Sequence, residues 1–257
     1  MYCANGILEK LKPMFEYTED TVVKSFFDGI LGNAYCDNLD CPSSAVITAG
    51  DFFFVAGNPA FSSEVMKLAK DKKMATFIPD SADWFEPLNS QEKKLLFLER
   101  YQTKLPEDGF DIDNLEKIKS KISQFNNLKL EPINENYYYK ALEEDWSKDF
   151  VGNLKNYDDF SRHGFGYVIT KNGEIIAGTS TFSYYNGGVE IEVSTREDYR
   201  GKGLAQISSA AFMLECLKRS LIPNWDARNK ASLAISKHMG FELKNKYIAF
   251  EFEEDNF

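Results

Sequence analysis

The sequence predicts an α+β protein of two domains: a smaller α/β domain at residues 1–127, then a mixed, mostly antiparallel sheet flanked by helices at residues 128–257. The chain has 257 residues, which is long for one hydrophobic core and sufficient for two. Residues 111–127 are polar and rich in Lys, Ser and Asn, and domain boundaries often fall in such stretches. Strand and helix patterns beyond it follow an order typical of a mixed sheet.

The first domain is expected to combine helices with a β-hairpin and one further strand. Apolar residues at helical spacing predict one or two helices over residues 7–31. Ala49-Gly50-Asp51 is a predicted turn between two apolar strands. The remaining predicted elements are strands 44–48, 52–56 and 74–78, helices 61–72, 90–100 and 113–125, and a turn at 108–111.

The second domain has clearer periodicity. Asn172-Gly173 predicts a tight hairpin turn, and Cys216 lies in the apolar stripe of a long predicted helix, where we expect core packing. The predicted elements are, in order, strand 128–133, helices 137–146 and 157–163, strands 166–170, 175–184 and 189–195, helix 203–220, strand 223–227, helix 231–239 and strand 241–252.

The composition excludes several classes of protein. A net charge of -10 without a basic cluster argues against a nucleic-acid partner, whereas an acidic surface suits a cationic substrate. The four cysteines form no CxxC pair, so we expect no metal site. Without a signal-peptide pattern or a run of roughly 18 apolar residues, we expect a cytoplasmic protein with reduced thiols and no membrane association.

A glycine-rich turn between a predicted strand and helix is the strongest functional signal. Its sequence is Arg200-Gly201-Lys202-Gly203-Leu204-Ala205-Gln206. The two glycines allow a ligand to approach the backbone, and the amides at a helix N-terminus favour an anion. Arg200 and Lys202 add positive charge. The turn is therefore a candidate pyrophosphate site, although glycine spacing alone is also typical of an ordinary turn.

Two other phosphate-binding motifs do not fit. The chain has no GxxxxGK[ST] sequence, which a P-loop requires. A dinucleotide-binding GxGxxG motif needs a third glycine and the first strand of a βαβ unit. Here Ile207 occupies the third position, and three antiparallel strands are predicted to precede the turn.

Residues 200–205 resemble the R/Q-x-x-G-x-G/A signature of the GNAT superfamily of N-acetyltransferases. The resemblance extends from about Leu128 to Phe252, and it includes Asn229 and Gly240-Phe241, where the family has a helix that starts at Asn and ends before Gly-Phe or Gly-Tyr. More narrowly, residues 199–205 and 221–226 resemble the subgroup of zwittermicin A resistance proteins, which carry an extra N-terminal domain. The element order of residues 1–127 is faintly similar to a degenerate half of this fold.

The resemblance implies acetyl-coenzyme A as co-substrate. Backbone groups at the end of strand 189–195 should pair with the pantetheine arm like an added strand, and the amides of residues 201–206 should hold the pyrophosphate. Asn229 should contact the cofactor or cap its helix. The implied cofactor-binding residues are Val193, Ser194, Thr195, Arg200, Gly201, Lys202, Gly203, Leu204, Ala205, Gln206 and Asn229.

Two glutamates are candidates for the catalytic base. Glu190 and Glu192 share one face of strand 189–195, because side chains alternate along a strand. Acetyl transfer to an amine needs a base for the ammonium proton and a donor for the oxyanion. By resemblance, Glu192 is the first choice for the base and Glu190 the second, and the amide of Val193 or Ser194 is the oxyanion donor. The alternative is that both carboxylates lie on a solvated face.

The acid that protonates the leaving thiolate is less well defined. Many family members have a Tyr seven residues after the helix-starting Asn, where this chain has Ser236, a poorer proton donor. Ser236 is therefore a catalytic candidate by position. Tyr184, Tyr185 and Tyr247 are alternatives.

The sequence thus predicts an N-acetyltransferase that transfers acetyl directly to a small-molecule amine, which the subgroup suggests is antibiotic-like. One alternative is a non-catalytic module that binds acetyl-coenzyme A or coenzyme A. Another is a protein N-acetyltransferase. A homodimer is compatible with the sequence.

Overall fold

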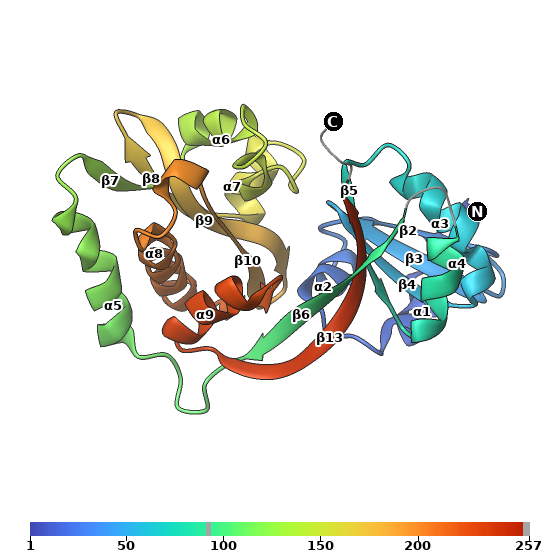
Figure 1. Cartoon of the computed structure of the whole chain (residues 1–257). Helices are drawn as coiled ribbons and strands as arrows, with labels where there is room; N and C mark the ends of the chain where they lie inside the picture. The colour runs from blue at the N-terminus through green and yellow to red at the C-terminus, as the bar shows by residue number, and fades with distance from the viewer. Residues whose placement is uncertain (91–93, 254–257) are drawn as a thin grey trace. The chain divides into compact units, whose positions relative to one another are not determined.

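The computed structural model describes residues 1–90 and 94–253 (Figure 1). The chain divides into two compact units. The first contains residues 1–100 and the C-terminal segment from Lys246, and the second contains residues 101–245. The boundary predicted near residues 126 and 127 lies inside the second unit, before strand β7 (Leu128–Pro132).

The first unit is a mixed sheet with short helices. Its strands follow the order β1-β2-β3-β4-β5-β13-β6, and the predicted hairpin is present as β3 and β4. Strands β4 and β5 are parallel, with α3 between them in the chain. The elements are β1 (Tyr2–Cys3), α1 (Leu8–Leu11), α2 (Thr21–Phe27), β2 (Asn33–Cys36), β3 (Ser44–Ala49), β4 (Phe52–Gly57), α3 (Ser62–Ala69), β5 (Met74–Pro79), α4 (Phe85–Asn89), the first part of β6 (Leu96–Lys104) and the last part of β13 (Glu242–Glu253).

The helix predicted over residues 90–100 is wrong where the structure describes this segment. Residues from Leu96 onward form strand β6, while residues 91–93 lie outside the described part. Phe97 stacks on Phe85 with ring centroids 4.1 Å apart and meets Phe250 of β13 edge-on at 5.5 Å. A short apolar run does not distinguish a strand from a helix by periodicity, and here aromatic packing beside β13 favours the strand.

The second unit has a five-stranded sheet in the order β11-β10-β9-β8-β7. All neighbours are antiparallel except β10 and β11. The predicted strand 223–227 is interrupted at Trp225, and the piece after it pairs with β6. The elements are α5 (Ile112–Ser120), the 3-10 turn η4 (Lys121–Gln124), β7, α6 (Glu135–Leu142), α7 (Tyr157–His163), β8 (Gly166–Lys171), β9 (Glu174–Tyr185), β10 (Gly188–Thr195), α8 (Leu204–Lys218), β11 (Ile222–Asn224), β12 (Asp226–Ala227) and α9 (Lys230–His238).

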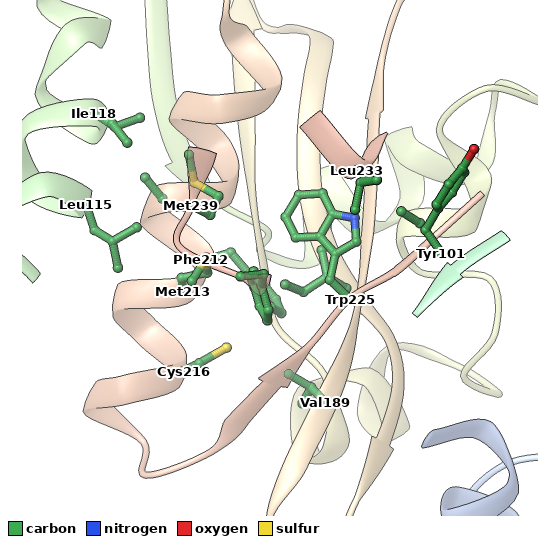
Figure 2. Packing of buried hydrophobic residues seen from close by; sticks show 14 of the residues in the cluster. Tyr101, Leu115, Ile118, Val189, Phe212, Met213, Cys216, Trp225, Leu233 and Met239 are labelled. Carbon is green, nitrogen blue, oxygen red and sulfur yellow. The ribbon is translucent and has the colours of Figure 1, made fainter. Parts of the chain in front are cut away.

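Helix α8 occupies the core of the second unit. It packs against the sheet on one side and against α5 on another, so apolar residues surround it (Figure 2). Phe212 and Met213 are fully buried beside Leu115 and Ile118 of α5. This packing stabilises the helix, since deleting a large buried side chain such as Phe212 costs about 3–5 kcal/mol.

Cys216 also lies in this core, as expected. Burial strongly raises the pKa of its thiol. A thiol that stays protonated is a poor nucleophile, so Cys216 is not suited to carry an acyl group. Among the described residues, no helix has the length and hydropathy to cross a bilayer.

Candidate active site

Strand β10 has an open edge along the second half of its length. It pairs with β9 from Gly188 to Thr195, but with β11 only from Gly188 to Glu190. From Ile191 onward, no described strand pairs with that side of β10. Backbone groups on an open strand edge readily hydrogen-bond an extended ligand. The edge includes Val193, Ser194 and Thr195, which the family resemblance assigns to the pantetheine arm.

A set of hydrogen bonds turns the chain away from β10 after Asn224. The Glu190 carboxylate accepts the backbone N–H of Asp226 at 2.7 Å. Asn224 Nδ2 donates to the Val189 carbonyl at 3.2 Å and to the Tyr185 hydroxyl at 3.1 Å. Trp225, which ends the pairing, donates its indole N–H to Ser232 at 2.9 Å. Glu190 therefore helps to hold the strands apart, a role that the sequence analysis did not predict.

The glycine turn ends at an uncapped helix. Gly201 and Gly203 have φ of +76° and +77°, a left-handed conformation that favours glycine. A Cβ at either position would meet no atom within 4 Å, so the space above the turn is open. Gly203 is the N-cap of α8, and no side chain accepts a hydrogen bond there. In the described structure, the backbone N–H groups of residues 204–206 have no hydrogen-bond acceptor. Free amides, open space and a 15-residue helix together favour the binding of an anion at this turn.

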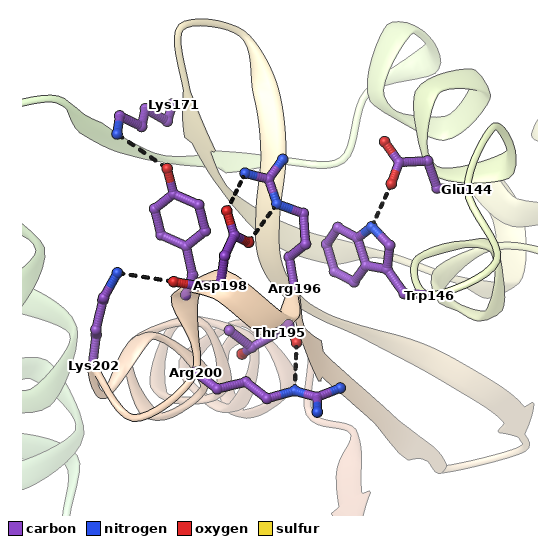
Figure 3. Close-up of polar contacts among 9 residues, drawn as sticks. Glu144, Trp146, Lys171, Thr195, Arg196, Asp198, Arg200 and Lys202 are labelled. Atoms are coloured by element: carbon purple, nitrogen blue, oxygen red, sulfur yellow. Dashed lines mark hydrogen bonds and ion pairs between the residues drawn. The ribbon is translucent and has the colours of Figure 1, made fainter.

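The charged side chains of the turn are held by neutral backbone oxygens (Figure 3). Arg200 Nε donates to the Thr195 carbonyl at 3.2 Å, and Lys202 Nζ donates to the Asp198 carbonyl at 3.1 Å. The Thr195 hydroxyl is buried and has no hydrogen-bond partner among the described residues. An unsatisfied buried hydroxyl costs about 1–3 kcal/mol, and a ligand at the strand end could supply the missing partner.

The two glutamates of β10 lie on the face that the alternation predicts. Val189 and Ile191 are buried in the core on the opposite face, while Glu190 and Glu192 are half-buried. The pairing register with β9 shifts between Glu190 and Ile191, so that Phe182 of β9 falls between two successive register pairs. Such bulges are frequent next to active sites, where they redirect a side chain. No sequence pattern marks this bulge.

Asn229 caps helix α9. Its side-chain oxygen accepts the backbone N–H of Ser232 at 2.9 Å, while its amide nitrogen is left for other contacts. Both roles that the sequence left open, a cap and a cofactor contact, are therefore compatible with its position. Asn229 itself is exposed.

Ser236 is fully buried within α9, and its hydroxyl donates to the Leu233 carbonyl at 2.9 Å. The hydroxyl would have to leave this bond to protonate a thiolate. Tyr247 belongs to the first unit and accepts a hydrogen bond from Arg100 at 3.0 Å. Tyr184 and Tyr185 are the sequence-predicted alternatives within the second unit. Burial raises the pKa of Tyr185, and the nearby Glu190 carboxylate raises it further.

The buried hydroxyl of Ser236 leads to a direct test. We expect Ser236→Ala to change kcat by less than about threefold, which corresponds to about 0.7 kcal/mol of barrier. Loss of the bond to Leu233 should lower the free energy of unfolding by about 0.5–1.5 kcal/mol. Steady-state kinetics and urea unfolding of the variant measure the two effects. A drop in kcat of a hundredfold without a change in folding would instead identify Ser236 as the acid.

Comparison with known proteins assigns the family. The model of the GNAT acetyltransferase family matches residues 12–250. The chain belongs to this family. The match spans both units, so it extends well before Leu128, where the sequence resemblance began. The predicted superfamily, acetyltransferase activity and fold of mostly antiparallel sheets flanked by helices are confirmed. Enzymes of the GNAT family use acetyl-coenzyme A in general.

Individual relatives agree with this assignment. The chain is 32% identical to a GCN5-related N-acetyltransferase-like protein from Streptococcus suis, with a TM-score of 0.88 over 95% of this chain and 97% of that one. It is 23% identical over 262 residues to YdfB, an uncharacterized N-acetyltransferase of Bacillus subtilis, covering 93% and 94% of the two chains. A tandem GNAT protein from the clavulanic acid biosynthesis pathway shares the fold, with 11% identity, a TM-score of 0.53 and coverage of 100% and 98%.

Proposed function

We propose that this GNAT enzyme transfers acetyl from acetyl-coenzyme A directly to the amine of a small molecule, with both substrates bound together. The observation that carries the proposal is the continuity of the open β10 edge with the uncapped glycine turn. Extended backbone donors and acceptors lead from Ile191 to Thr195, and an anion site follows within a few residues. This order matches a ligand in which an amide-containing arm ends in a pyrophosphate.

The residues present fit acetyl-coenzyme A. Val193, Ser194 and Thr195 would hold the pantetheine amides through their backbone. The amides from Gly201 to Gln206, with Arg200 and Lys202, would hold the pyrophosphate. Asn229 would contribute its free amide nitrogen. The bound co-substrate supplies an activated acetyl thioester. Cys216 is buried and its thiol pKa is raised, which supports direct transfer rather than an acyl-cysteine intermediate.

Glu192 is the proposed base, acting directly or through water on the ammonium of the acceptor. It shares the face of β10 with Glu190, whose carboxylate accepts the Asp226 amide and is therefore committed to the strand separation. An amide of Val193 or Ser194 would stabilise the oxyanion. Tyr184 and Tyr185 are the proposed acids in the second unit, although a thiolate also leaves unaided.

The acceptor is proposed to be a cationic, antibiotic-like amine. The net charge of -10 favours approach of a cation, and the likeness to zwittermicin A resistance proteins supports the same class. We also propose a cytoplasmic location, from the sequence pattern and the four free cysteines. That residues 1–127 form a separate domain stays a prediction. That the protein forms a homodimer also stays a prediction.

A thiol-release assay tests the function. Purified protein, acetyl-coenzyme A and a panel of polyamine, aminosugar and peptide amines should release free thiol above background with at least one small amine. A blank without acceptor corrects for exposed Cys3 and Cys41 of the protein. Titration calorimetry with coenzyme A measures binding independently. Binding without turnover on any small amine would contradict the proposed acceptor class, and turnover only on basic peptides would indicate a protein acetyltransferase.

A further inference from the structure

Three cationic side chains surround the ring of Tyr199, next to the glycine turn. Lys202 Nζ lies 4.5 Å from the ring centroid, and the Arg196 guanidinium carbon lies 4.9 Å from it. Lys171 Nζ lies 5.4 Å from the centroid and donates to the Tyr199 hydroxyl at 3.0 Å (Figure 3). Because both ammonium groups lie close to the same ring centroid, they are at most 9.9 Å apart.

These charges are poorly compensated by carboxylates. Asp198 binds Arg196 through both oxygens, at 2.8 and 3.0 Å. Lys202 lies close enough to contribute to the lowered pKa of Asp198, but the hydrogen bond of its ammonium goes to the Asp198 carbonyl. In the described structure Lys171 binds only the neutral Tyr199 hydroxyl. The chain has 40 acidic and 30 basic residues. Despite this excess of carboxylates, the ammonium groups of Lys171 and Lys202 both lie beside Tyr199, and neither donates a hydrogen bond to a carboxylate among the described residues. This arrangement favours an external anion.

Lys171 is also held in place by its local structure. It ends β8 at a tight turn in which Asn172 and Gly173 have φ of 53° and 85°, as the Asn-Gly pair predicts. Glu174, the register partner of Lys171 across the turn, forms its ion pair with Lys140, with Oε1 and Nζ 3.5 Å apart. Lys140 also donates to the Gly173 carbonyl at 2.7 Å. The turn thus presents Lys171 beside Tyr199 with little freedom, which lowers the entropic cost of binding an anion.

The second unit also has a pocket of about 460 Å³, which is connected to this cation cluster through Leu128 and a shared apolar core. It is bounded by η4, the end of α5 and strand β7. Its apolar lining comes from Ile122, Phe125, Leu128 and Leu130. Lys129 also lines it, together with Lys119 and Glu116, which form an ion pair at 3.1 Å. Leu128 is the register partner of Lys171, so both side chains lie on the same face of the sheet. Tyr199 packs against the same small core as the four apolar residues.

We propose that this side of the turn binds the 3′-phosphoadenosine end of coenzyme A. Lys171 and Lys202 hold the ribose 3′-phosphate, and the pocket beside Leu128 receives the adenine, with Phe125 available for stacking. The proposal rests on the proposed function, because it extends the same ligand beyond its pyrophosphate. It adds Lys171 and Tyr199 to the binding site, and it assigns Lys202 to the 3′-phosphate rather than to the pyrophosphate alone.

Dephospho-coenzyme A, which lacks only the 3′-phosphate, provides the test. Calorimetry on the full chain should show coenzyme A binding about tenfold more tightly than dephospho-coenzyme A, as expected for one charge-assisted hydrogen bond to phosphate. The Lys171→Met variant should bind coenzyme A about as weakly as dephospho-coenzyme A. Its affinity for dephospho-coenzyme A should stay that of the wild type. Lys171→Arg should retain the preference for coenzyme A. Lys218→Met, which removes the same charge at the opposite end of α8, is the matched control and should keep the preference.

The outcomes separate this proposal from the proposed function. If the wild-type chain binds neither ligand, the coenzyme A site itself is wrong. If both ligands bind wild type equally, or if Lys171→Met weakens both equally, the site exists but the 3′-phosphate is not held by Lys171. A preference that disappears in Lys171→Met and persists in Lys218→Met supports the subsite. A Phe125→Ala variant should weaken both ligands, since both contain adenine, and unchanged affinity would remove the pocket from the proposal.

Discussion

Gly203→Asp should lower the affinity for coenzyme A by about 5- to 1000-fold, because repulsion between the added carboxylate and a phosphate about 4 Å away is worth about 1–4 kcal/mol. Gly203 has a φ of +77°, where a side chain is strained. A Cβ there would enter the open space above the turn, and the added carboxylate would lie where the pyrophosphate is proposed to bind. The charge would repel the phosphates and would compete for the amides of residues 204–206.

Gly109 offers a matched control for the backbone strain. It also has a φ of +77° and no atom within 4 Å of an added Cβ, and it lies in a turn of the same unit. Gly109→Asp should therefore cost similar stability without affecting binding. Calorimetry with coenzyme A and thermal unfolding of both variants separate the two effects. If Gly203→Asp binds as tightly as wild type, the pyrophosphate does not lie at this turn.

The turn could be predicted from sequence because its signal is local. Two glycines, two cations and the start of an apolar helix lie within seven residues, and each has a backbone or charge consequence that does not depend on distant parts of the chain. The face shared by Glu190 and Glu192 could be predicted for the same reason, since alternation follows from strand geometry.

Features that depend on partners far away in the chain could not be predicted. The separation of β10 and β11 depends on Glu190 reaching the Asp226 amide, 36 residues later. The cation cluster depends on Lys171 reaching Tyr199, 28 residues later. The strand at Leu96 depends on β13, at the other end of the chain. Neither propensity nor periodicity contains such pairings, because both describe only neighbours in sequence.

Glu192→Gln should lower kcat about 10²- to 10⁴-fold, which is the usual contribution of a general base. Glutamine keeps the size and the hydrogen-bonding shape of the side chain but accepts no proton. Without the base, only acceptor molecules already present as free amine can react. The rate of the variant should therefore keep rising with pH toward the pKa of the amine, which is about 10.4 for a lysine-like group. The difference from wild type should narrow accordingly at high pH.

Glu190→Gln is the matched control, because it makes the same isosteric change on the same face of β10. Its side-chain oxygen can still accept the Asp226 amide, so the strand separation should persist and kcat should change little. Measuring kcat and kcat/KM from pH 6 to 10 for both variants distinguishes the two carboxylates. If Glu190→Gln alone loses the low-pH activity, then Glu190 is the base and its contact with Asp226 must open during turnover. If neither variant changes the profile, the proton leaves by another route and the β10 carboxylates serve only the fold.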